Sequence, residues 1–236
     1  MPSRKLQQSM YELRHPSRAQ RWTLALFAAL ATALAWWLLL GAGLRRTGLL
    51  FAASWPSGDP LRRACLAAAF SIYFVRLLFT EFVFLRRGVS WKEVFTVAPW
   101  LLFIVLFLTV EGGRNPARPA PAFWLGAFLF LLGSWMNSYA EFARHRWKLQ
   151  PSHQGRLYTG TLFRWTRHPN YLGDLLSFSG LCLFTGRWIT AIIPALMLTG
   201  FVFVNIPVLD AHLRDHYGAE FDDYARHTRK LIPYIY

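Results

Sequence analysis

Residues 22–43, which read WTLALFAALATALAWWLLLGAG, decide the fold class of this chain. The stretch contains no charged residue, and roughly 20 apolar residues are enough for a helix to cross about 30 Å of hydrocarbon. It is also longer than the apolar core of a signal peptide. The stretch therefore predicts a transmembrane helix that is retained in the protein.

Further apolar runs follow this first one, and together they predict about six membrane spans. The last two runs are separated only by Arg187, which predicts a tight C-terminal helical hairpin. A hairpin that enters the membrane only part way would leave five spans. We expect an all-α, polytopic transmembrane helical bundle. The expected spans are residues 22–43, 64–85, 95–110, 121–142, 171–186 and 188–209.

Composition and charge agree with a membrane protein. Of the 236 residues, 54% are hydrophobic and 16% are charged, whereas a soluble domain has about 25% charged residues. Eighteen of the 26 lysines and arginines lie in alternate segments beginning with the N-terminus, seven lie in the opposite loops, and Arg76 lies inside a span. This asymmetry predicts that both termini are cytoplasmic. The net charge of +14 is explained by these loops, and with no nucleic-acid motif we expect no nucleic-acid partner.

Polar side chains recur along the fourth span at steps of three or four residues, so they share one helix face. Snorkelling into the membrane interface explains the basic members. The wall of an internal pocket explains Asn137 and Glu141 better, and we favour it. The stripe consists of Ser134, Asn137, Ser138, Glu141, Arg144 and Lys148.

Arg76 lies about ten residues from the cytoplasmic end of the second span, a depth at which a charge needs a partner. Glu81, Glu141 or Asp174 can supply the counter-ion. A structural ion pair and a ligand contact are equally compatible with this pattern.

The most informative stretch for chemistry is TLFRWTRHPNYLGD, residues 161–174. Pro169 suits the first turn of a helix, and the free N–H groups of that turn, with Arg167 and His168 before it, can bind an anion. Further along, Asn170 and Asp174 fall on one face of the helix. The alternative is an ordinary membrane entry in which the two basic residues meet lipid phosphates.

The octapeptide RHPNYLGD, residues 167–174, resembles the signature of the sterol C14/C7 reductases. The ending IPYIY, residues 232–236, is similar to theirs as well, and short bacterial relatives of the steroid 5-alpha-reductase C-terminal domain share this layout. The Arg-His-Pro-x-Tyr core also occurs in isoprenylcysteine carboxyl methyltransferases, which use S-adenosylmethionine. Looser similarity runs through Asn137 with Arg144 and through Tyr217 with Tyr224.

This resemblance implies a membrane domain over residues 121–236 that holds NADPH from the cytoplasmic side, preceded by N-terminal transmembrane helices over residues 1–120. A carbon–carbon double bond of a lipid-like substrate would be reduced. Arg167 would contact cofactor phosphate, and Asn170 and Asp174 the nicotinamide or ribose end. Tyr171 is the candidate proton donor, because a phenol with a pKa near 10 holds its proton at neutral pH. Asp174 joins it as a catalytic candidate, and the other expected cofactor-binding residues are Asn137, Arg144, His168, Asp210, Tyr217, Tyr224 and Arg229.

Two departures from the sterol reductases keep the methyltransferase reading open. Their Arg-x-x-Arg-Asp group is missing from residues 205–210, where Asp210 stands in the place of a methyltransferase glutamate. The chain is also much shorter than a sterol reductase. A third reading is a non-enzymatic lipid-binding protein that keeps the motif without the chemistry.

Basic residues in the tail have two interpretations. Arg226, Arg229 and Lys230 can hold the 2′-phosphate of a cofactor or attract anionic lipids, and lipid is favoured for Arg226 and Lys230. His212 and His216 have a spacing that can bind zinc, but no third ligand stands out beyond Asp210, so we expect no metal.

The expected location is a bacterial inner membrane, where the partners are membrane lipids and a lipid-like substrate.

Overall fold

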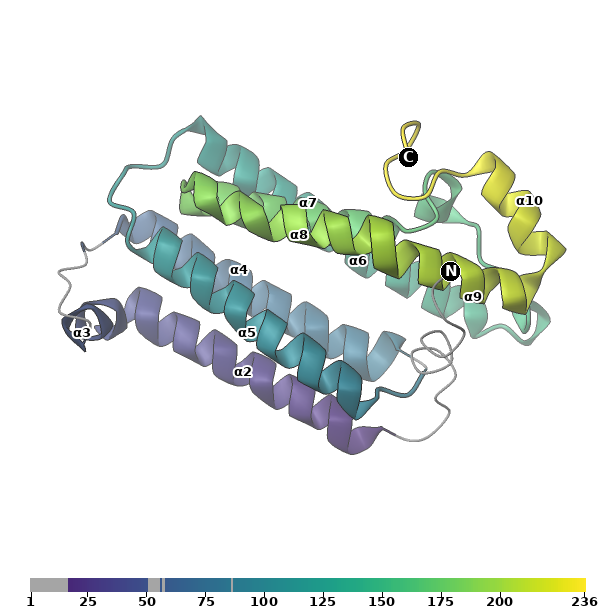
Figure 1. Ribbon diagram of the computed structural model, residues 1–236, viewed down its shortest axis with the longest axis horizontal. Coiled ribbons are helices and arrows are strands. Elements are labelled where there is room, and N and C mark those ends of the chain that lie inside the picture. Colours follow the sequence, from purple (N-terminus) through teal and green to yellow (C-terminus); the bar gives the residue numbers. More distant parts are fainter. Residues whose placement is uncertain (1–16, 51–55, 57, 86) are drawn as a thin grey trace.

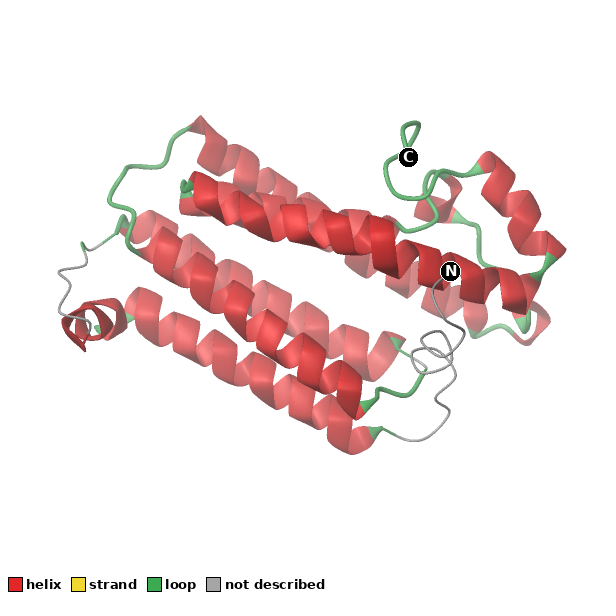
Figure 2. Cartoon of the chain, in the orientation of Figure 1, coloured by secondary structure: helices red, strands yellow, loops and turns green. Residues whose placement is uncertain are grey.

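The computed structural model describes residues 17–50, 56, 58–85 and 87–236. Within these ranges it contains helices and no strand. The long helices run side by side along the longest axis of the molecule (Figures 1 and 2). The predicted all-α membrane bundle is therefore confirmed. Most of the N-terminal basic segment, residues 1–16, lies outside the described residues.

Three long helices form the N-terminal half of the bundle (Figure 1). Side-chain caps begin two of them: Asp59 accepts a hydrogen bond from the Arg62 N–H, and Ser90 accepts one from the Glu93 N–H. The half comprises α2 (Arg18–Leu40), the short α3 (Gly43–Leu50), α4 (Pro60–Phe79) with its π-helical continuation η1 (Thr80–Phe84), and α5 (Trp91–Gly113).

The C-terminal half contains the predicted tight hairpin. Gly186 ends α7 with a φ of 62°, a left-handed conformation that glycine adopts without a steric penalty, and the chain then turns back alongside α7 (Figure 1). The elements are α6 (Pro121–Lys148), η2 (Pro151–His153), η3 (Thr161–Arg164), α7 (Pro169–Thr185), η4 (Trp188–Ala191), α8 (Ile192–Gly200), η5 (Phe201–Asn205), α9 (Ile206–Tyr217) and α10 (Ala219–His227).

Among the residues that the structure describes, four helical segments are long and apolar enough to cross a membrane. They are Arg18–Leu40, Pro60–Phe84, Trp91–Gly113 and Trp188–Tyr217. Helices α6 and α7, which account for the other two expected spans, do not meet this criterion: α7 has 17 residues, and α6 carries the polar stripe. The chain is an integral membrane protein.

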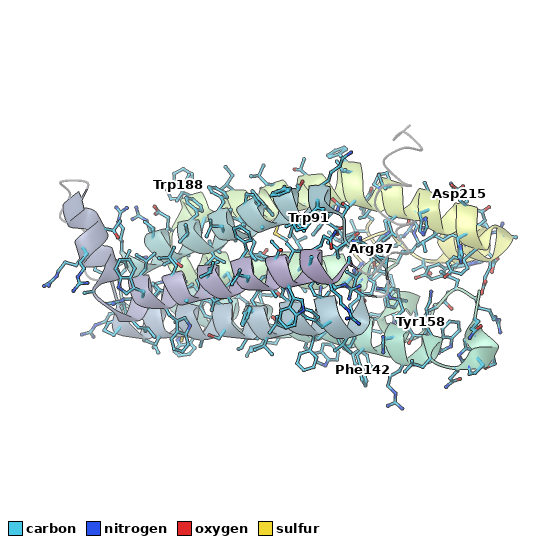
Figure 3. The ribbon with its side chains drawn as sticks, turned by 90° about the horizontal axis from the view of Figure 1, so that it is seen from below. Arg87, Trp91, Phe142, Tyr158, Trp188 and Asp215 are labelled. Atoms are coloured by element: carbon cyan, nitrogen blue, oxygen red, sulfur yellow. The ribbon has the colours of Figure 1, made fainter. Side chains whose placement is uncertain are left out.

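The segments rich in basic residues meet at one end of the bundle, which we call the polar end. The Arg21 guanidinium at the start of α2 donates to the carbonyl oxygens of Leu85 at 2.9 Å and Arg87 at 2.7 Å. Figure 3 shows Arg87, Tyr158 and Asp215 toward this end and Trp188 toward the other. The alternation expected from the charge count is therefore present in the described residues, and the cytoplasmic side of the polar end stays a prediction.

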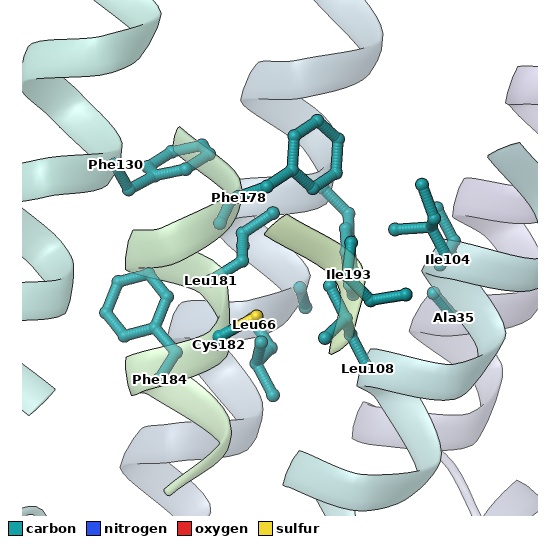
Figure 4. Packing of buried hydrophobic residues seen from close by; sticks show 14 of the residues in the cluster. Ala35, Leu66, Ile104, Leu108, Phe130, Phe178, Leu181, Cys182, Phe184 and Ile193 are labelled. Carbon is teal, nitrogen blue, oxygen red and sulfur yellow. The ribbon is translucent and has the colours of Figure 1, made fainter. Parts of the chain in front are cut away.

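The apolar core joins the two halves of the bundle. Large side chains of α7 pack between α6 on one side and the N-terminal helices on the other (Figure 4). Ile193 brings α8 into the same cluster and is fully buried. The cluster includes Leu66, Leu108, Phe130, Phe178, Leu181 and Phe184.

Helices α6 and α7 touch backbone to backbone at two glycine pairs. A Cβ atom added to Gly133 would lie 2.3 Å from the Gly173 carbonyl oxygen, and one added to Gly180 would lie 2.5 Å from the Gly126 carbonyl oxygen. Small residues permit this closeness in membrane helix pairs, where packing replaces the hydrophobic driving force. The contact sets the position of α7, and with it the position of the Pro169 segment.

We predict that Gly133→Ala destabilises the protein while Gly200→Ala does not. The new methyl group at position 133 has no room, and overpacking typically costs about 1–3 kcal/mol. At Gly200, a helical glycine of the same membrane domain, the nearest atom to the added Cβ is the Asn205 Oδ1 at 3.8 Å. Thermal unfolding in detergent measures the difference, and equal midpoints for the two variants would contradict the glycine contact.

Candidate active site

A cavity of about 800 Å³ opens at the polar end, within the range of roughly 300–1,000 Å³ typical of small-molecule sites. Its walls come from η1, α6, α7 and α9, which are far apart in the sequence. The lining combines basic side chains with polar and aromatic ones. These include Arg87, Arg144, His145, Lys148, Glu141, Asn170, Tyr171 and Tyr217.

The polar stripe of α6 divides into two parts with different surroundings. Ser134 and Asn137 are buried against α7, where the Asn137 amide donates to the Asn170 carbonyl oxygen at 3.0 Å. Glu141, Arg144 and Lys148 line the cavity. The pocket wall inferred from the sequence therefore begins at Glu141, and the deeper residues serve the helix contact.

The Pro169 helix begins at the predicted residue and turns two side chains of its first turn to the cavity. The Asn170 amide donates to the Glu141 carboxylate at 3.3 Å. The Tyr171 ring lies between two others: it stacks on Phe201 at a centroid distance of 4.7 Å and on His168 at 5.3 Å. Phe201 belongs to the π-helical segment η5, a type of distortion frequent at functional sites.

Asp174 lies one helical turn deeper than Asn170 and forms the ion pair with Arg76. Its Oδ1 is 2.7 Å from Arg76 Nη2, and the two side chains are 25% and 9% exposed. Asp174 is thus the counter-ion among the three candidates. The catalytic role expected of Asp174 stays a prediction.

The buried Arg167 and His168 and the partly buried Asp210 form an ion-pair cluster, which we call the Asp210 cluster. Arg167 Nη2 is 2.8 Å from one oxygen of Asp210, and His168 Nε2 is 2.9 Å from the other. Arg167 Nη1 also donates to the carbonyl oxygens of Ala225 and Thr228. These contacts bind the C-terminal tail to α7 and α9. The expected contact of Arg167 with cofactor phosphate stays a prediction, and its side chain borders a small side chamber of about 60 Å³.

The remaining residues that were expected to bind the cofactor differ in whether they line the cavity. Tyr217 lines it and accepts a hydrogen bond from Lys148 at 2.8 Å. Tyr224 borders the side chamber and donates to the Phe163 carbonyl oxygen at 2.6 Å, and burial raises the pKa of Tyr224. Arg229 contributes its backbone, which pairs with Thr166 and Arg167, while its side chain is exposed. The structure therefore does not bring the Arg229 side chain to the described lining.

Some lining residues had no signal of their own in the sequence. Thr80 and Arg87 come from the second expected span and the loop after it. His212 and His216, considered from the sequence only for their zinc-like spacing, both line the cavity on α9. Their register relative to α6 can be found only from the fold. The described residues contain no group of three side chains that could hold a metal ion.

Comparison with known proteins gives one family and two kinds of enzyme relative. The family described as "Protein of unknown function (DUF1295)" matches residues 85–228. The 3-oxo-5-alpha-steroid 4-dehydrogenase 2 of Homo sapiens is 29% identical over 114 residues, which are 48% of this chain and 43% of that protein. Two methyltransferases are also similar, and these comparisons confirm the predicted superfamily around the steroid 5-alpha-reductase C-terminal domain.

The two methyltransferases match shares of this chain close to the share matched by the steroid dehydrogenase. A probable O-methyltransferase of Ustilaginoidea virens is 33% identical over 102 residues, 43% of this chain and 35% of its own length. The methanethiol S-methyltransferase of Mycobacterium tuberculosis is 27% identical over 117 residues, 48% of this chain and 47% of its own length. The matched segment spans less than half of each relative.

We predict that Asp210→Asn loosens the tail. It leaves Arg167 buried without its counter-ion, and breaking a buried pair costs about 3–5 kcal/mol. Limited proteolysis after Gly218 should therefore become faster. Asp223→Asn is the matched control, because Asp223 pairs with Arg226 on the exposed surface of α10, where an ion pair is worth about 0–1 kcal/mol. Equal cleavage rates in the two variants would disprove the role of the Asp210 cluster in holding the tail.

Proposed function

We propose, from the premise that the chain belongs to the family described as "Protein of unknown function (DUF1295)", that it is a membrane-embedded, NADPH-dependent reductase. The substrate class is a sterol, steroid or isoprenoid-like lipid with a carbon–carbon double bond. The steroid dehydrogenase relatives support this reaction. Residues 121–236 would carry most of the cofactor site.

The charge of the cavity is the observation that carries the choice of cofactor. Two lining cations have acidic partners, Arg144 with Glu141 and Arg87 with Glu93. Lys148 is bonded to the neutral Tyr217 phenol, so the cavity keeps positive charge. Such a site attracts the phosphates of NADPH and repels the sulfonium of S-adenosylmethionine.

The first turn of α7 would hold the reacting end of the cofactor. The Asn170 amide can turn from Glu141 to a ligand, and the Tyr171 ring is fixed by its two stacked neighbours. When bound, NADPH supplies a hydride to one carbon of the double bond. The Tyr171 hydroxyl donates a proton to the other carbon, and the resulting phenolate regains a proton from water in the cavity.

The membrane location follows from the apolar helices. The side of the membrane on which the cofactor site lies is part of the proposal. The excess of lysine and arginine at the polar end supports a cytoplasmic cofactor site. The resemblance to short bacterial proteins supports the inner membrane of a bacterium.

An S-adenosylmethionine-dependent methyltransferase is the second candidate. It is favoured by the methyltransferase relatives and by Asp210, which pairs with Arg167 and His168 where that group of enzymes keeps a glutamate. Both cofactors carry adenosine, so one cavity can fit either.

A direct contest between the two cofactors tests the proposal. We expect NADPH, and not S-adenosylmethionine, to raise the unfolding temperature of purified protein in detergent. Arg144→Gln should weaken NADPH binding about tenfold or more, because a hydrogen bond to a charged group contributes about 1.5–3 kcal/mol. Arg146→Gln, an exposed arginine on the same helix, should leave binding unchanged. Stabilisation by S-adenosylmethionine alone would replace the reductase with the methyltransferase.

Tyr171→Phe separates chemistry from binding. The ring stacking remains while the hydroxyl is lost, so NADPH binding should persist and turnover of an isoprenoid enone should fall by roughly 10²–10⁴-fold. NADPH oxidation measures turnover. Tyr139→Phe is the control, since Tyr139 stacks on Trp135 on the outer face of α6. Unchanged turnover in Tyr171→Phe would remove Tyr171 as the proton donor.

A further inference from the structure

Arg76 carries an unused hydrogen-bond donor inside the membrane domain. Its side chain is 9% exposed, and Nη2 is committed to Asp174. Nη1 is buried and makes no hydrogen bond with the described part of the chain. Buried donors are almost always paired, because an unmade hydrogen bond is destabilising. The unpaired nitrogen is therefore free to donate to an acceptor that arrives with a ligand.

The Arg76–Asp174 pair lies between the cavity and the apolar core. Thr80, one turn after Arg76, and Asn170, one turn before Asp174, both line the cavity. On the other side, the Arg76 guanidinium lies 4.8 Å from the centre of the Tyr73 ring, which packs edge-on against Phe178 at 5.3 Å. The pair thus lies one helical turn beyond two residues of the cavity lining.

The depth of Arg76 in the membrane domain and its ion pair with Asp174 limit which chemical group can accept a hydrogen bond from Nη1. Arg76 precedes the end of η1 by eight residues, which is about 12 Å along a helix that rises about 1.5 Å per residue. Only the inner end of a ligand with an apolar body would reach that level. The ion pair is already neutral, so a second anion would bring uncompensated charge into a low-dielectric region. An uncharged oxygen atom is therefore the acceptor that is compatible with this position.

We propose that Arg76 is a specificity-determining residue, whose Nη1 donates a hydrogen bond to a ketone or hydroxyl oxygen at the buried end of a lipid-like ligand. Asp174 holds the guanidinium in place for this contact. The proposal rests on the proposed function only in placing the lipid in the same cavity. Arg76 precedes the family match, which begins at residue 85, so it can distinguish this chain from relatives that share the matched segment.

Binding of matched isoprenoid probes tests the proposal. The probes are farnesylacetone, its hydrocarbon analogue with a methylene in place of the ketone, and the corresponding carboxylic acid. Dissociation constants come from thermal stabilisation in detergent. We expect the wild-type protein to bind the ketone about tenfold more tightly than the hydrocarbon, as one net hydrogen bond of about 1.4 kcal/mol would give. Tighter binding of the carboxylate would overturn the uncharged acceptor.

Arg76→Lys keeps the charge beside Asp174 and removes the forked donor, so the preference for the ketone should disappear. Arg62→Lys is the matched control: Arg62 is a buried arginine of the same helix, bonded to carbonyl oxygens near the opposite end, and the preference should remain. If Arg76→Lys does not fold, the neutral double variant Arg76→Met with Asp174→Asn replaces it, with the same expectation. A preserved preference in the Arg76 variant would overturn the proposal.

Stabilisation by NADPH, measured on the same samples, separates the two proposals. A wild-type protein that prefers the ketone but does not respond to NADPH would keep the role of Arg76 and refute the reductase. A protein that is stabilised by NADPH but shows no preference for the ketone would keep the reductase and refute the role of Arg76.

Discussion

The backbone contact between α6 and α7 is the constraint on which the rest of the structure depends. Gly126 meets Gly180 and Gly133 meets Gly173, so the two helices approach more closely than any side chain would allow. At that distance the Asn137 amide reaches the Asn170 carbonyl oxygen, and Glu141 reaches the Asn170 side chain. A wider spacing would remove both contacts, and the first turn of α7 would lose its orientation toward the cavity.

A second interaction closes the site from behind. Asp210 of α9 binds Arg167 and His168 just before α7, while Arg167 also binds carbonyl oxygens of the tail. Asp210 and Arg167 together therefore hold three distant parts of the chain. This explains how a loop, a membrane helix and a tail maintain one wall of a cavity that opens at the polar end.

The arrangement suits the divergence of the relatives. A steroid dehydrogenase and two methyltransferases are each similar to part of this chain. A scaffold can be shared while the reaction is decided by side chains that line the cavity. Here the lining keeps positive charge, and Arg76, from outside the family segment, lies one helical turn from the lining residue Thr80. The expected division at residue 120 runs through this cavity, because η1 supplies part of the wall.

The sequence alone was enough for the fold class, the helix that starts at Pro169, the hairpin at Arg187 and the superfamily. These depend on local composition and spacing: apolar length, the missing N–H of proline, and a short specific motif. Tertiary structure decided which polar residues face the cavity and which pack between helices. Asn137 and Glu141 share one stripe, yet one supports α7 and the other lines the cavity. It also selected Asp174 from three possible partners of Arg76 and brought His212 and His216 to the wall. Helical periodicity defines the face of a side chain, but the neighbour on that face depends on how closely and in what register separate helices pack.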